Sequence, residues 1–126
     1  MQLLDLSRLK QTVNADPEFK LTARLLNAKL KLQIGTEQAL ISIKDGAVVD
    51  VNESPTFFDE WDIIASGPAE GWQKLLQSVP PPLYQDLFPA AVHRGFSVGG
   101  NLDLLFGYYA AFRRLTDLLR KIANNP

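Results

Sequence analysis

The chain has 126 residues, of which 46% are hydrophobic and 21% are charged, and its formal net charge is −1. These values are typical of a globular chain with one hydrophobic core, so they exclude disordered and collagen-like classes and predict a single domain over residues 1–126. The near-neutral charge offers no basic field to nucleic acid, and the absence of cysteine excludes disulfides and thiolate metal sites. We therefore expect a cytoplasmic protein without a nucleic-acid partner.

Two short helices are predicted at the N-terminus. Leucines recur at helical spacing from Leu3 to Val13, and Asp16 followed by Pro17 is typical of an N-cap and the first residue of a second helix, which extends to about Ala28. Charged residues interrupt the first leucines, so no signal peptide is expected.

A three-stranded antiparallel meander is predicted over residues 29–51. Apolar and polar residues alternate over residues 30–34 and again over residues 39–43, as in strands with one buried face. Asp45-Gly46 favours the two-residue turn of a hairpin. Helices must cover the single apolar face of such a sheet, because no other elements are available to do so.

The second half of the chain predicts two more strands and three helices. A strand at residues 61–66 leads into a helix at residues 68–79, and a short helix is interrupted near Pro89. A fifth strand holds residues 96–98, and the longest helix, residues 102–123, is apolar over a broad arc. We expect an α/β (α+β) fold, with a mostly antiparallel five-stranded sheet covered on one face by helices and a long C-terminal helix.

Residue types that carry catalysis or bind metals are sparse. His93 is the only histidine, which excludes a two-histidine metal site within one chain, and no Gly-x-Ser-x-Gly motif supplies a nucleophile. Two interpretations are open for the acids Asp59, Glu60 and Asp62. They can include an acid/base pair, or they can form a solvent-exposed segment that leads into a strand. We expect no catalytic residue, no metal ligand and no cofactor, and so no enzyme.

Aromatic residues are abundant. They can form the core, as aromatic residues in small domains mostly do, or some of them can line a ligand cavity, and both interpretations stay open. The residues concerned are Phe57, Phe58, Trp61, Trp72, Tyr84, Phe88, Phe96, Phe106, Tyr108, Tyr109 and Phe112. We count Phe88 among the candidate ligand contacts.

Three stretches, taken in order, resemble the sterol carrier protein 2-like (SCP2-like) family of lipid-binding domains. They are the hairpin strand at residues 41–46, the strand and tryptophan-bearing helix at residues 63–76, and the late strand, glycine turn and helix start at residues 96–105. Order and spacing carry the resemblance, which covers residues 29–122.

The resemblance implies an apolar tunnel between sheet and helices that holds fatty acyl chains, sterols or isoprenoid lipids and does no chemistry on them. Matching by position to the family implies ligand contacts at seven residues, which are Trp72, Leu76, Phe96, Val98, Leu105, Phe106 and Tyr109. The same match also fits residues that only pack in the core.

Two segments depart from the family pattern. Residues 80–95 form a longer and more proline-rich link, and the helix at residues 102–123 is longer and more aromatic, so the ligand size and the tunnel mouth are left open. Arg94 lies in the link. It is either a polar anchor for a carboxylate head group or an ordinary surface arginine.

Two functions remain open. The first is a non-catalytic binding or carrier domain for a hydrophobic ligand. The alternative is an accessory or regulatory domain that docks on a lipid-pathway enzyme, or forms a homodimer, through the C-terminal helix, because that helix is apolar beyond one face. At most transient membrane contact is expected from the basic residues of this helix, which are Arg113, Arg114, Arg120 and Lys121.

Overall fold

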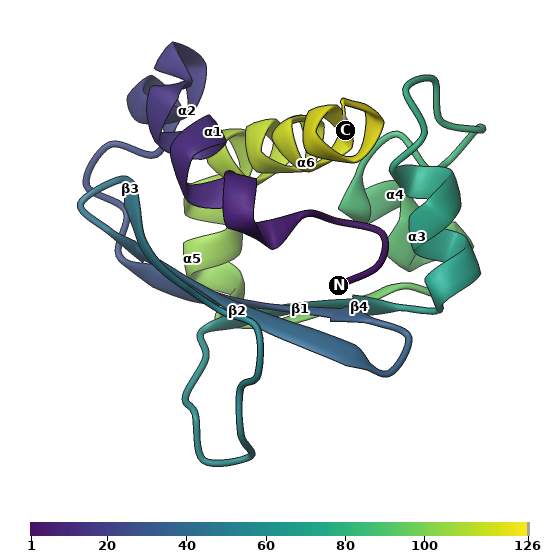
Figure 1. Ribbon diagram of the computed structural model, residues 1–126, viewed down its shortest axis with the longest axis horizontal. Coiled ribbons are helices and arrows are strands. Elements are labelled where there is room, and N and C mark those ends of the chain that lie inside the picture. The colour runs from purple at the N-terminus through teal and green to yellow at the C-terminus, as the bar shows by residue number, and fades with distance from the viewer. Residues whose placement is uncertain (126) are drawn as a thin grey trace.

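The computed structural model describes residues 1–125 and places five strands in one sheet (Figure 1). The strands are β1 (Ala28–Ile34), β2 (Glu37–Lys44), β3 (Ala47–Asn52), β4 (Ile63–Gly67) and β5 (Ser97–Gly100), in the order β3-β2-β1-β4-β5. Strands β1 and β4 are parallel, and the other neighbouring pairs are antiparallel. The sheet is therefore mixed and mostly antiparallel, which confirms the predicted architecture.

The helices cover one face of this sheet, whereas the loop between β3 and β4 extends to the other side (Figure 1). They are η1 (Leu6–Arg8), α1 (Leu9–Ala15), α2 (Pro17–Thr22), α3 (Ala69–Leu75), α4 (Leu87–His93), α5 (Leu102–Gly107) and α6 (Tyr109–Asn124). Within residues 1–125, none of these helices is long and apolar enough to cross a membrane.

The predicted meander is confirmed. In β1 and β2, Leu30 lies opposite Ile41 and Leu32 opposite Ala39, and all four side chains are buried. Asp45 and Gly46 form the turn between β2 and β3, with φ angles of 50° and 79°. Alternation along the strands thus gives the sheet one apolar face, and the helices pack on it.

The lengths of three helices differ from the sequence prediction. Helix α2 ends at Thr22 rather than near Ala28, and α3 ends at Leu75, which leaves Val79 85% exposed. The long C-terminal helix is broken into α5 and α6 at Tyr108, which has φ −118° and ψ 29°. The break directly follows Gly107, a residue with low helix propensity.

The two late strands begin later than predicted, at Ile63 and Ser97. Asp62 directly precedes β4, and its carboxylate accepts a hydrogen bond from the Lys29 N–H at 2.7 Å. Asp59 closes a local turn by accepting from the Thr56 N–H at 2.7 Å. These bonds favour the structural interpretation of the acidic segment over an acid/base pair.

An ion pair joins α2 to α6. Arg114 donates to both carboxylate oxygens of Asp16, at 2.9 Å from Nε to Oδ2 and 2.8 Å from Nη2 to Oδ1. Asp16 is also the N-cap of α2 and accepts from the Phe19 N–H at 2.8 Å. The hydrogen bond from Arg114 lowers the pKa of Asp16 below its ordinary value of 3.8. The charged form of Asp16 therefore stabilises the fold.

We expect Asp16→Ala to lower the free energy of unfolding by about 2 kcal/mol at neutral pH, because a helix cap and the partner of a half-buried guanidinium are lost together. The pKa of Asp16 is lower in the folded state than in the unfolded state, so its contribution is present above about pH 4 and is lost as the pH falls through the folded-state pKa. Urea denaturation at a series of pH values checks this. If the difference in free energy of unfolding between Asp16→Ala and the parent does not depend on pH, the prediction is contradicted. The control is Asp50→Ala, which changes an exposed aspartate of β3.

Candidate functional site

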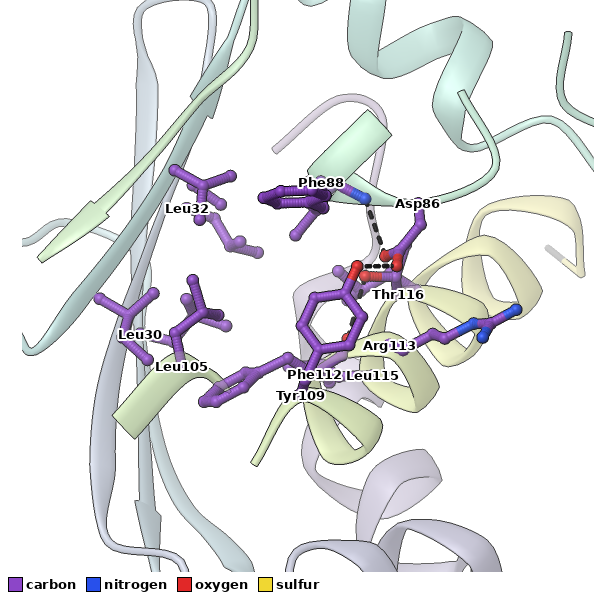
Figure 2. Close-up of a pocket in the computed structure, with 15 residues that line it drawn as sticks. Leu30, Leu32, Asp86, Phe88, Leu105, Tyr109, Phe112, Arg113, Leu115 and Thr116 are labelled. Carbon is purple, nitrogen blue, oxygen red and sulfur yellow. Dashed lines mark hydrogen bonds between the residues drawn. The ribbon is translucent and has the colours of Figure 1, made fainter. Parts of the chain in front are cut away.

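An apolar pocket lies between the sheet and the C-terminal helices (Figure 2). Strands β1, β4 and β5 form its floor, and α4, α5 and α6 form its roof. The lining residues are Leu30, Leu32, Ile63, Ala65, Asp86, Leu87, Phe88, Val98, Leu105, Tyr109, Phe112, Arg113, Leu115, Thr116 and Leu119. Polar side-chain atoms come from Asp86, Tyr109, Arg113 and Thr116 alone within this lining.

The pocket is nearly filled by its own side chains. Its free volume is about 20 Å³, which is room for about one water molecule. Sites that hold drug-sized molecules have volumes of roughly 300–1,000 Å³. A lipid can therefore enter only if the residues of the roof move outward.

A partly buried polar pair joins α4 to α6 at this pocket. Asp86 is 9% exposed and is the N-cap of α4, where its Oδ1 accepts from the Leu87 N–H at 2.8 Å. The Tyr109 hydroxyl donates to Asp86 Oδ2, as the dashed line in Figure 2 shows. Burial and this hydrogen bond raise the pKa of Tyr109 well above its ordinary value of 10.0. The phenol therefore stays protonated at neutral pH and remains the donor of the pair.

Three aromatic rings form the outer edge of the roof. The ring of Phe88 meets those of Phe106 and Tyr109 edge to face, with centroids 6.2 Å and 6.5 Å apart. Phe88 is 48% exposed and Phe106 is 56% exposed. Half-exposed side chains have room to rotate, so moving Phe88 or Phe106 loses less packing than moving the buried residues of the lining.

The sequence-predicted contacts fall into two groups. Phe88, Val98, Leu105 and Tyr109 line the pocket together, and Phe106 touches Phe88 from outside the lining. These side chains come from α4, β5, α5 and α6, so the fold brings together residues from four elements.

The other group lies outside the pocket lining and consists of Trp72, Leu76, Phe96 and Arg94. Trp72 is fully buried, and its Nε1–H donates to the Gln33 carbonyl at 2.9 Å. Its ring lies 5.2 Å from that of Phe96, and Leu76 is buried at the C-terminal end of the same helix. The guanidinium of Arg94 lies over the ring of Tyr84 at 5.6 Å and does not line the pocket.

Sequence reasoning missed Asp86, Thr116 and the floor residues Leu30 and Leu32. Asp86 had a local signal, since an aspartate before Leu-Phe-Pro is typical of an N-cap. Its contact with Tyr109 joins residues 23 positions apart and has no local signal. Over the described range 1–125, no three histidine, aspartate or glutamate side chains gather in the way a metal ion requires.

Comparison with known proteins rests on structure, because no protein-family model and no curated protein matches the sequence. A crystal structure of a sterol carrier protein 2 superimposes with a TM-score of 0.72 at 18% identity, covering 92% of this chain and 93% of that chain. This chain has the SCP2-like fold. A conserved hypothetical protein from Thermus thermophilus, described as possibly a sterol carrier protein, matches the SCP2-like chain with a TM-score of 0.71 at 18% identity, covering 94% and 85% of the two chains.

A third match is the UbiJ-SCP2 ubiquinone synthesis protein, with a TM-score of 0.59 at 19% identity, covering 91% of this chain and 87% of that chain. At these identities the likeness concerns the fold. It confirms the resemblance predicted from the sequence, and the pocket thus lies between the two layers of an SCP2-like domain.

Proposed function

We propose that this SCP2-like domain is a non-catalytic carrier that holds a fatty acyl, sterol or isoprenoid lipid between its sheet and its helices. The observation that carries the proposal is the apolar pocket enclosed between β1, β4, β5 and the helices α4 to α6. Two similar structures, a sterol carrier protein 2 and a ubiquinone synthesis protein, have names that refer to lipids, which supports a ligand of this kind.

The ligand contacts in this proposal are Phe88, Val98, Leu105 and Tyr109. Phe88 turns away from Phe106 as the ligand enters, and the apolar tail takes the place of side chains that now fill the pocket. Binding then gains free energy from apolar area removed from water, about 25 cal/mol per Å².

Organic extraction of the freshly purified protein followed by mass spectrometry tests the carrier function. A mock-purified protein of similar size, prepared in parallel, is the control. We expect a hydrophobic molecule in stoichiometric amount. An empty extract, together with no binding of a fluorescent fatty acid or sterol, contradicts the proposal.

Narrowing the pocket is expected to weaken binding. Val98 lies on the floor and is only partly buried, so Val98→Trp fills space that a ligand would need. We expect at least about a tenfold loss of affinity for a fluorescent lipid, together with a lower melting temperature, because overpacking the nearly filled pocket costs about 1–3 kcal/mol. Binding is therefore measured where circular dichroism shows the variant to be folded. Val49→Trp is the matched control, because Val49 is an exposed strand residue on β3 outside the pocket lining. Equal affinity in both variants would argue against this pocket as the lipid site.

The alternative function, docking through the C-terminal helix, stays a prediction. The apolar side chains of α6, among them Phe112, Leu115 and Leu119, are buried within the domain. Its solvent-facing residues include Arg113, Asp117 and Lys121. No observation therefore favours the alternative over the carrier function.

A further inference from the structure

Apart from the exposed Arg113, the polar side chains of the pocket lining have no free hydrogen-bond donor. The Tyr109 hydroxyl has its proton committed to Asp86, and the Thr116 hydroxyl donates to the Phe112 carbonyl at 3.0 Å. The Asp86 carboxylate is an acceptor only. A ligand head group that enters this part of the pocket must therefore bring a donor of its own.

The charges at the pocket act against an anionic head group. Asp86 is 9% exposed, and a second carboxylate beside its own would place like charges together in a poorly hydrated site. Arg113 also lines the pocket, but it is exposed, and Figure 2 shows its guanidinium turned away from the Tyr109 ring. Solvent and salt screen that outer charge more than the buried one.

The two charges oppose each other at the Tyr109 hydroxyl, since Asp86 raises the pKa of Tyr109 and Arg113 lowers it. A cationic head group would be attracted by Asp86, but it would lose its hydration on entering the apolar pocket, and Arg113, which also lines the pocket, would repel it. A neutral donor avoids both repulsions, and a hydroxyl is the simplest such group on a lipid.

On the basis of the proposed carrier function, we propose that Asp86 and Tyr109 form a head-group site that admits a hydroxyl and excludes a carboxylate. The hydroxyl donates to a free lone pair of Asp86 or Tyr109, while the tail lies along Leu30 and Leu105. This assignment replaces the carboxylate anchor considered for Arg94, whose guanidinium lies on Tyr84 outside the lining.

Two probes with the same tail test the site: dodecanol and dodecanoic acid, each with a terminal pyrene. At about pH 8 the acid is fully ionised. We expect the parent protein to bind the alcohol at least about tenfold more tightly than the acid. In Asp86→Asn the difference should fall to about threefold or less, because the asparagine keeps the N-cap of α4 and removes the charge.

Asp103→Asn is the matched control, since Asp103 is an exposed residue in the first turn of α5, and it should leave the ratio of affinities unchanged. Tyr109→Phe should weaken binding of the alcohol, whereas Tyr108→Phe, a neighbouring tyrosine outside the pocket lining, should not.

Equal binding of the two probes by the parent protein overturns the head-group site and leaves the carrier function standing. An unchanged ratio in folded Asp86→Asn does the same. If that variant fails to fold, the comparison of Tyr109→Phe with Tyr108→Phe decides, and equal binding of the alcohol by these two variants overturns the head-group site. Tighter binding of the corresponding pyrene-labelled amine overturns the choice of a hydroxyl. Failure of every probe to bind the parent overturns the carrier function itself, and the head-group site with it.

Discussion

Replacing Trp72 with alanine is expected to lower the free energy of unfolding by about 4 kcal/mol, within the range for large aromatic side chains removed from a core. Trp72 is fully buried beneath α3, where its ring packs against Phe96. Truncation leaves a cavity between α3 and the sheet. It also leaves the Gln33 carbonyl without the indole donor that lies 2.9 Å away. Urea or thermal denaturation measures the effect.

Trp72→Phe separates the two causes. Phenylalanine keeps much of the packing but cannot donate to Gln33, so we expect a loss of about 1–2 kcal/mol. Phe57→Ala is the control for removal of an aromatic ring: Phe57 is 94% exposed, and the change should stay within about 0.5 kcal/mol. A small effect of Trp72→Ala would mean that the domain collapses around the cavity far more completely than cores usually do.

Gly100→Ala is expected to destabilise the domain by about 3 kcal/mol or more, because it combines backbone strain with a steric clash. Gly100 has φ +102°, and a Cβ atom there would lie 2.2 Å from the Asp62 carbonyl oxygen. That oxygen also accepts the Asn101 N–H at 2.8 Å, and the Asn101 side chain caps α5. A shift of the backbone between β5 and α5 would therefore also move Leu105, which lies on α5 and lines the pocket.

Two other glycines are controls for this effect. Gly95 has φ +74° but nothing within 4 Å of a Cβ atom, so Gly95→Ala should cost only the backbone strain, about 1 kcal/mol. Gly107 has open space and no positive φ, so Gly107→Ala should be neutral or slightly stabilising. Similar thermal denaturation midpoints for Gly95→Ala and Gly100→Ala would contradict the role of the clash with Asp62.

The sheet was largely predictable because its signals are local. Alternation from Leu30 to Ile34 fixes which side chains face inward, and Asp45-Gly46 sets the hairpin turn. The helix ends were harder to predict. Apolar spacing continues through Tyr108 although the helix breaks there, because periodicity records which residues can be buried and not whether the backbone stays helical between them.

The candidate site was predictable in part for a related reason. Val98, Leu105 and Tyr109 were matched by position to the late strand and the closing helix of the family, and they line one pocket. Trp72 and Phe96 came from the same match but pack outside the lining, because a strand and a helix each have more than one side that can be buried. Asp86 was missed because its partner comes from a helix that starts much later in the chain.

The sequence by itself determined the order of the elements, the apolar face of the meander and the scarcity of catalytic and metal-binding residues, since periodicity, turn chemistry and composition act over short distances along the chain. Only the tertiary structure decided the parallel pairing of β1 with β4, the Asp86–Tyr109 pair and the closed state of the pocket. The physical reason is that free volume and buried hydrogen bonds depend on how side chains from distant segments fill one space together.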